Sequence, residues 1–64
     1  MENTYLLNER QAAEMIGCSV ALTRKWRRLG EGPSYCKIGR LVRYRAEDIN
    51  AFLEANRVTT GAAR

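Results

Sequence analysis

Four cationic residues within five positions have the clearest chemistry in this 64-residue sequence: Arg24, Lys25, Arg27 and Arg28. Guanidinium and ammonium groups donate hydrogen bonds to phosphate oxygens and neutralise their charge. No acidic residue occurs between Ser19 and Gly30 to pair with them along a helix. The pattern favours contact with a polyanion, and the alternative is a basic helix face that is only solvated.

Charge is segregated along the chain. The net charge is +4, with no histidine. Residues 24–45 hold eight cations and one acid, whereas residues 1–23 hold one cation and three acids, and residues 46–64 hold two cations and three acids. A basic middle within an acidic frame is typical of a surface that binds phosphates.

Catalytic and metal-binding chemistry have little support. Cys18 and Cys36, without histidine or a C-x-x-C spacing, do not make a closed zinc site. We expect them to be small core residues rather than metal, redox or disulfide groups. Glu47 and Asp48 stand at a predicted helix start, where carboxylates complement the helix dipole. We therefore expect no enzyme activity, no cofactor and no small-molecule substrate.

Length and hydropathy predict the domain organisation and the compartment. No apolar run approaches the roughly 20 residues needed to span a bilayer, and no signal peptide is evident, so we expect a cytoplasmic protein without membrane contact. A chain of this size predicts one domain, which we place at 1–57, followed by a disordered tail at 58–64.

A short helix must position the cations. Ser19 is a candidate N-cap and Gly30 a candidate C-terminal stop, which leaves about three turns between them. Arg24, Arg27 and Arg28 are expected on its outer side, and Trp26 in the core. Two sets of residues could form the buried side: Val20, Thr23 and Trp26, or Leu22, Trp26 and Leu29.

A preceding helix is predicted over Glu9–Ile16. Asn8 and Gln11 have the spacing of a capping box at its start. Its apolar face has helical periodicity, and Glu9 and Glu14 are expected outside. The apolar residues are Ala12, Ala13, Met15 and Ile16. Because only Gly17 and Cys18 separate this helix from Ser19, the pair is expected to form a helix-turn-helix.

A basic hairpin and a third helix are predicted after the cationic helix. Residues 35–38 and 41–44 read as strands around Gly39-Arg40, a pair that fits a type II′ turn. Alternation predicts one apolar face and one basic face. The apolar face would hold Cys36, Ile38, Val42 and Tyr44, and the basic face Lys37, Leu41, Arg43 and Arg45. Arg40 at the tip could contact a minor groove or its phosphates, and the alternative role for these charges is to block edge aggregation. The third helix is placed at Ala46–Asn56, with Ile49, Phe52 and Leu53 as its apolar stripe.

Three runs of residues carry a family resemblance. They are Leu6-Leu7-x5-Ala13-x2-Ile16-Gly17-x-Ser19, Trp26-Arg27-Arg28-x-Gly30-x-Gly32-Pro33, and Tyr35-x-Lys37-Ile38-Gly39-Arg40-x-Val42-Arg43-Tyr44-x3-Asp48-Ile49-x-Ala51-Phe52-Leu53. On these runs the chain resembles the excisionase-like small helix-turn-helix family, a branch of the MerR-type winged-helix proteins, and the resemblance covers about Tyr5–Arg57. The resemblance implies a mainly α winged helix-turn-helix, with three helices and a two-stranded antiparallel wing.

The resemblance also implies a binding site on double-stranded DNA. The second helix would enter the major groove and the hairpin would act as the wing. The predicted helix site is Ser19, Val20, Ala21, Leu22, Arg24, Lys25, Arg27 and Arg28, and the predicted wing site is Lys37, Arg40, Arg43 and Arg45. Relatives often have Thr-Leu where this chain has Leu22-Thr23, so either the helix is rotated or Leu22 contacts a thymine methyl group.

By the same resemblance, the expected function is that of a recombination directionality factor. Such a protein binds repeated sites, associates cooperatively with itself, bends the DNA and helps a phage integrase to excise the element. A small transcriptional regulator with the same fold is the close alternative. An RNA or protein adaptor is a more distant one, because Tyr35 is the only aromatic residue not assigned to the core and single-strand binders usually expose several.

Overall fold

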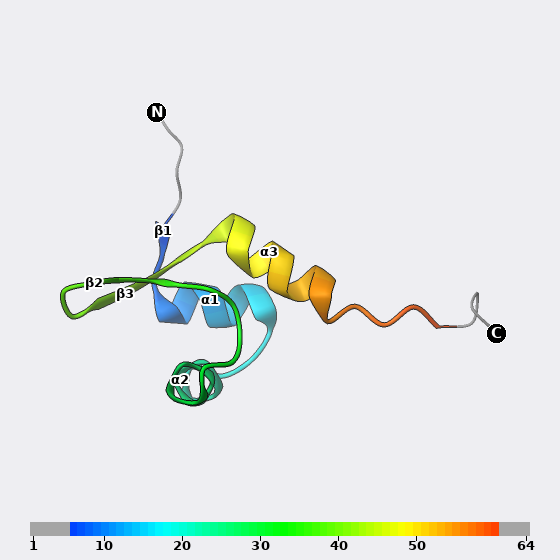
Figure 1. The fold of residues 1–64 in the computed structure, drawn as a ribbon, viewed down its shortest axis with the longest axis horizontal. Helices are drawn as coiled ribbons and strands as arrows, with labels where there is room; N and C mark the ends of the chain where they lie inside the picture. The colour runs from blue at the N-terminus through cyan, green and yellow to red at the C-terminus, as the bar shows by residue number, and fades with distance from the viewer. Residues whose placement is uncertain (1–5, 61–64) are drawn as a thin grey trace.

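The computed structural model describes residues 6–60, which form three helices and a small antiparallel sheet (Figure 1). The elements are β1 (Leu6–Leu7), α1 (Glu9–Ile16), α2 (Val20–Leu29), β2 (Cys36–Ile38), β3 (Leu41–Arg45) and α3 (Ala46–Ala55). Residues 58–60 form no helix or strand, and 61–64 and 1–5 lie outside the described residues. The predicted domain limits and the disorder of the tail therefore stay predictions.

The predicted helix caps are confirmed. The Asn8 side chain accepts from the Gln11 N–H at 2.8 Å, and the Gln11 side chain accepts from the Asn8 N–H at 2.9 Å. The Ser19 hydroxyl accepts from the Leu22 N–H at 3.1 Å. Gly17 (φ 89°) and Gly30 (φ 72°) end the two helices in the left-handed conformation that a residue without Cβ adopts readily. Because caps act within one turn, local sequence is sufficient to predict them.

The sheet has three strands in the order β1-β3-β2. The prediction of a two-stranded sheet therefore missed one strand, β1. Leu6 and Leu7 of β1 lie opposite Arg45 and Tyr44 at the base of β3. A strand of two residues is too short to show the alternation by which strands are recognised. β1 fixes the hairpin to the start of α1.

The predicted faces of the hairpin are wrong, although its turn is confirmed. Among the described residues only glycines have positive φ, and Gly39 has φ 62°, which leaves Arg40 at negative φ, as a type II′ turn requires. Ile38 lies opposite Leu41, Cys36 opposite Arg43 and Lys37 opposite Val42. Directly opposed residues share a face of an antiparallel pair. Ile38 and Cys36 therefore lie with Leu41 and Arg43, because a two-residue turn pairs even positions with odd ones.

The core lies between the helices and the base of the sheet. Ala12, Tyr44 and Ile49 are at most 1% exposed, and Leu7, Ile16 and Val42 pack around them. Met15, Ile38 and Leu53, which were predicted to join this core, are exposed. The described part of α3 ends one residue earlier than predicted.

The buried side of α2 is the one that contains Thr23. Thr23 is fully buried, and its hydroxyl donates to the Val20 carbonyl at 2.7 Å, whereas Leu29 is 54% exposed. Trp26 is half-buried and packs on Phe52 with ring centroids 5.3 Å apart. The set Val20, Thr23 and Trp26 therefore faces the core, and the set ending in Leu29 does not.

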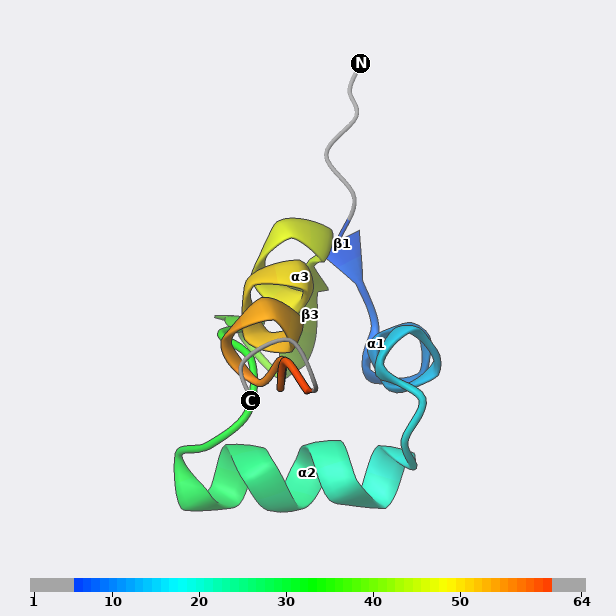
Figure 2. The ribbon, with the colours of Figure 1, turned by 90° about the vertical axis from the view of Figure 1, so that its right-hand side faces the viewer.

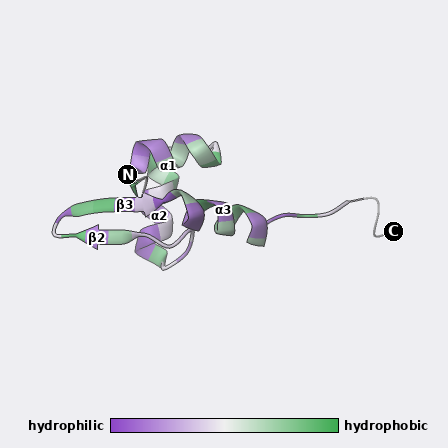
Figure 3. Ribbon diagram, turned by 90° about the horizontal axis from the view of Figure 1, so that it is seen from above, coloured by the Kyte–Doolittle hydropathy of each residue, from purple (hydrophilic) through white to green (hydrophobic). Residues whose placement is uncertain are grey.

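The hairpin and α2 project from different parts of a body formed by α1 and α3. Figure 1 shows α2 end-on below α1, while the β2–β3 hairpin extends past the start of α1. Figure 2 shows α2 along its length and α1 end-on, so α2 runs across α1. Figure 3 shows hydrophobic colouring near the hairpin tip and a mixed pattern along α2. None of the helices within residues 6–60 has both the length and the apolar character to cross a membrane.

Candidate nucleic-acid interface

α2 presents one continuous polar face to solvent. Ala21, Arg24, Lys25 and Arg28 are all exposed, and their spacing of three, four and seven residues places them on one side of a helix. This side is opposite to the buried Thr23. No acid of α2 interrupts the face, so its three cations lie together, as the sequence predicts.

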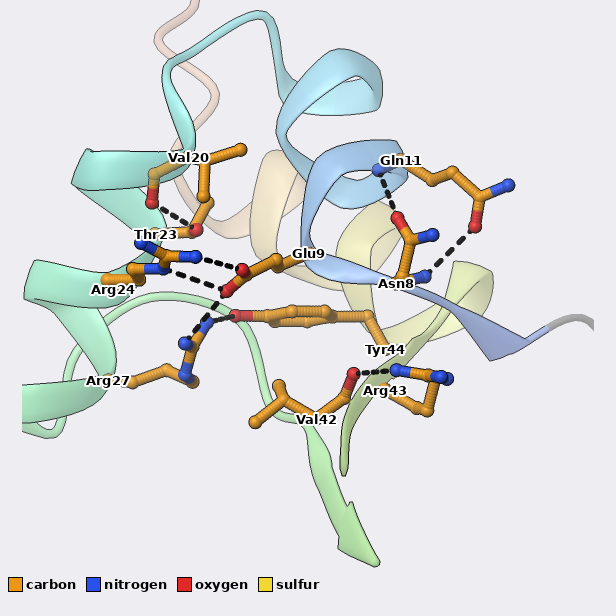
Figure 4. Close-up of polar contacts among 10 residues, drawn as sticks. All are labelled: Asn8, Glu9, Gln11, Val20, Thr23, Arg24, Arg27, Val42, Arg43 and Tyr44. Atoms are coloured by element: carbon orange, nitrogen blue, oxygen red, sulfur yellow. Dashed lines mark hydrogen bonds and ion pairs between the residues drawn. The ribbon is translucent and has the colours of Figure 1, made fainter. Parts of the chain in front are cut away.

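Arg27 does not belong to this outer face. Its side chain is only 17% exposed, and its Nη1 donates to the Tyr44 hydroxyl at 2.8 Å while its Nη2 donates to Glu9 Oε1 at 3.0 Å (Figure 4). Its guanidinium also lies 5.9 Å from the centre of the Tyr35 ring. The outward prediction is wrong because residue 27 lies one turn after Thr23, on the buried side of the helix. Arg27 ties α2 to α1 and β3.

Burial and hydrogen bonding shift the pKa of Arg27 in opposite directions. Burial alone would lower the pKa of its guanidinium, but the hydrogen bonds to Tyr44 and Glu9 outweigh it and the pKa is raised. Arg27 is therefore a permanent cation inside the fold. This structural use leaves it few donors for an external phosphate.

Glu9 lies at the centre of this network, contrary to the prediction that it stays outside. Its carboxylate is 28% exposed and accepts from Arg24 Nε at 3.2 Å and Nη2 at 2.5 Å, besides Arg27. The hydrogen bond from Arg24 is the largest cause of a lowered Glu9 pKa; partial burial opposes it, and Arg27 adds to it. The partners are 15 and 18 residues away in the sequence, so periodicity within one helix does not show them. The signal is the crossing of two helices joined by a tight turn, which brings the start of α1 to α2.

The basic residues of the hairpin divide into two groups. Lys37 and Arg40 are exposed near the tip, and Arg43 is half-buried with its Nη1 donating to the Val42 carbonyl at 2.8 Å. Arg45 lies at the far end of β3, 3.8 Å from Glu47. The prediction placed Arg45 with the other wing cations, but it stands at the base of the hairpin because it is paired with β1.

An open groove of about 680 Å³ joins the start of α1, α2 and the hairpin. Its walls are Asn8, Glu9, Arg10, Val20, Arg24, Arg27, Arg40, Leu41, Val42 and Arg43. Five arginines and one glutamate line it, so its charge is strongly positive. α2 and the wing therefore border one groove, and Arg24 is the residue of the exposed face of α2 that lines it.

The remaining predicted site residues contribute differently. Val20 lines the groove, whereas Ser19 and Leu22 do not. The Ser19 hydroxyl is occupied by its cap, and Leu22 is half-buried. Position 23, rather than 22, is the inward one, and Leu22 lies half-buried outside the groove.

The described residues show no arrangement for metal chemistry. Within residues 6–60, no three His, Cys, Asp or Glu side chains gather at one point. Cys18 and Cys36 are both half-buried free thiols, and burial raises the pKa of Cys18. A raised pKa makes the reactive thiolate form scarcer at neutral pH.

Comparison with known proteins identifies the domain type. A family model described as a helix-turn-helix domain matches residues 6–57, which include every described helix and strand. Neither the curated proteins nor the solved structures gave a match. The family match supports binding to double-stranded DNA.

Proposed function

Because this chain belongs to the helix-turn-helix domain family, we propose that it binds double-stranded DNA as an accessory factor of the excisionase type. The single observation that carries DNA binding is the cationic groove, which arginines of α1, α2 and the wing line together. A cationic groove with walls from two projecting elements suits a duplex, which offers phosphates on both sides of each of its own grooves.

In the proposed complex, α2 occupies the major groove. This groove is wide enough to admit one helix, and the exposed face of Ala21, Arg24, Lys25 and Arg28 would meet base edges and phosphates. The hairpin then follows the neighbouring backbone, with Lys37 and Arg40 placed for phosphate or minor-groove contacts. Arg27 acts within the protein, where it holds these two elements together.

The finer part of the proposal rests on the sequence resemblance. Three runs of residues resemble excisionase-like proteins, and a domain this small covers too little DNA for high specificity alone. We therefore propose that several copies bind repeated sites, contact one another, and bend the duplex for a phage integrase. The chain itself performs no catalytic step, since neutralising phosphates and deforming the duplex are sufficient for this role.

A salt titration tests the DNA-binding step. Gel shifts on a duplex from the region around the gene should show log K falling linearly with log salt, with a slope of about −0.9 for each phosphate contact. A flat salt response would exclude this mode of binding. Tighter binding to single-stranded RNA than to the duplex would favour an RNA adaptor instead.

Footprinting and an excision assay test the finer role. DNase footprints on the same DNA should show repeated, cooperatively filled sites, and excision by the cognate integrase should depend on the protein. Control of a reporter without any effect on excision would identify a transcriptional regulator that uses the same surface.

A further inference from the structure

The pair Glu9–Arg24 joins a fixed carboxylate to an exposed guanidinium. The Glu9 side chain is 28% exposed and also accepts a hydrogen bond from Nη2 of Arg27. Nη1 of the same guanidinium donates to the hydroxyl of the buried Tyr44. The position of the carboxylate is therefore set by the core. Arg24 is 61% exposed on the outer face of α2, yet two of its nitrogens are held by this carboxylate.

The contact uses one edge of the guanidinium and leaves another available. Nε and Nη2 donate to the two Glu9 oxygens, and Nη1 has no partner among residues 6–60. Figure 4 shows this third nitrogen on the side away from Glu9. Each Nη carries two hydrogens, so one N–H of Nη1 and one of Nη2 form a free pair of donors. Two such donors match the O6 and N7 acceptors of guanine in the major groove.

We propose that Arg24 contacts a guanine in the major groove through this free edge and that Glu9 is the residue that positions it. The inference rests on the proposed DNA binding. It further specifies that guanine is the base recognised and that Arg24 and Glu9 are the residues that select it. Glu9 restricts the rotamers of Arg24 before DNA arrives, so less conformational freedom is lost when the base contact forms.

The other cations of α2 are less suited to this role. Lys25 is a flexible point charge without a planar pair of donors. Arg28 is exposed and has no partner in the described part of the chain that would fix its orientation. Arg27 is directed inward to Tyr44 and Glu9. Lys25 and Arg28 suit phosphates, which position a protein on the duplex but carry no sequence information.

The negative charge of Glu9 also acts against non-specific binding. It repels phosphates from the part of the groove where Arg24 lies, and it occupies donors that would otherwise bind the backbone. A device that weakens the wrong contact while supporting the right one increases discrimination. Removing this charge should strengthen binding to arbitrary DNA while it weakens base selection.

The test is selection from a randomised duplex library, followed by gel shifts on the selected site and on single-base variants. The proteins are the wild type, Arg24→Lys, Arg24→Ala, Glu9→Gln and Glu14→Gln. Glu14→Gln is the matched control, because it removes the same charge from an exposed position of α1 that lies outside the groove. Circular dichroism melting checks that each variant is folded, and Arg24 is exposed enough for its variants to fold.

The wild type should prefer guanine at one position by roughly 5- to 150-fold, the range for one bidentate contact. Arg24→Lys should abolish the preference for guanine at that position. It should keep the base preferences at the other positions of the site and leave the salt slope of binding nearly unchanged. Arg24→Ala should also abolish the preference for guanine at that position. Glu9→Gln should reduce the preference at that same position and raise the affinity for non-specific duplex above that of Glu14→Gln.

Two results would overturn the inference while DNA binding stands: an unchanged guanine preference in Arg24→Lys, or equal behaviour of Glu9→Gln and Glu14→Gln. Binding that depends on salt but shows no base preference in the wild type would also overturn it. Absence of any duplex binding by the wild type would overturn the proposed function, and the guanine contact with it.

Discussion

At the scale of single residues, one half-buried cation holds the DNA-facing elements together. Arg27 links α2 to α1 through Glu9 and to β3 through Tyr44, at 3.0 Å and 2.8 Å. Tyr44 is 1% exposed, so its hydroxyl depends on Arg27 rather than on water for a hydrogen-bond partner. The relative placement of the helix and the wing therefore depends on a few polar contacts inside the fold.

Tyr44→Phe should lower the free energy of unfolding by about 2 kcal/mol, because it removes a hydrogen bond to a charged group and leaves an Arg27 donor unpaired. Chemical denaturation with urea measures this change. Tyr35→Phe is the matched control: its ring also lies beside Arg27, but its hydroxyl makes no hydrogen bond within the described residues. Equal losses for the two variants would contradict the role given to the Tyr44 hydroxyl.

The Glu9 carboxylate should make stability depend on acid pH. Because Arg24 and then Arg27 stabilise its charged form against partial burial, its folded-state pKa is below the ordinary value of 4.5. Its contribution is therefore fully present above pH 4.5 and is lost as the pH falls through the lowered pKa.

Urea unfolding of the wild type and Glu9→Gln at several pH values measures this contribution. The stability difference between them should be largest near neutral pH and should shrink below pH 4.5. Glu14→Gln, which removes a carboxylate without an ion pair in the described residues, provides the control. A wild-type to Glu9→Gln difference that stays constant down to pH 2 would contradict the assignment.

At the scale of elements, local chemistry determines what sequence can predict. The caps at Asn8 and Ser19 and the stops at Gly17 and Gly30 act within one turn, and both helices were predicted at their observed limits. The hairpin turn was predicted as well, but the faces of its strands were not, because register depends on pairing between strands. β1 and the partners of Glu9 depend on contacts that are distant in the sequence. The clustering of basic residues was therefore predictable, and the Arg24–Glu9–Arg27 network was not.

Gly32 should be the least replaceable of the turn glycines after α1. It has φ +84°, and a Cβ there would lie 2.9 Å from Trp26 Cβ and 3.0 Å from the Trp26 ring. Gly17 has a similar φ of +89°, but a Cβ there would meet nothing within 4 Å. Gly17→Ala should cost about 1 kcal/mol of stability for the left-handed conformation alone. Gly32→Ala should cost clearly more, because Trp26 must also shift to make room for the added methyl group.

Thermal and urea unfolding of the two alanine variants give the comparison. Trp26 fluorescence should shift in Gly32→Ala, where the ring is displaced, and stay unchanged in Gly17→Ala. Equal stability losses together with identical fluorescence would show that the loop after α2 moves freely enough to absorb the added methyl group.

At the scale of the whole molecule, charge is placed by the fold and not only by the sequence. The chain has 11 cations, but one groove collects arginines from α1, α2 and the hairpin, while Arg45 and Arg57 lie beside acids elsewhere. The groove cations other than Arg27 can meet one duplex at the same time. Arg45 and Arg57 add to the net charge without adding phosphate contacts.

Substitutions of Arg40 and Arg57 distinguish the contribution of a phosphate contact from that of net charge. Each substitution to alanine removes one positive charge from an exposed site, Arg40 at the hairpin tip and Arg57 beside Glu54 after α3. Arg40→Ala should reduce the magnitude of the salt slope of DNA binding by about 0.9, the value for one lost phosphate contact. Arg57→Ala should leave the slope unchanged and lower the affinity only slightly, because its distant charge is screened over a Debye length of about 10 Å at 0.1 M salt. Equal slope changes for the two variants, measured by gel shift between 50 and 200 mM salt, would mean that net charge rather than the groove governs binding.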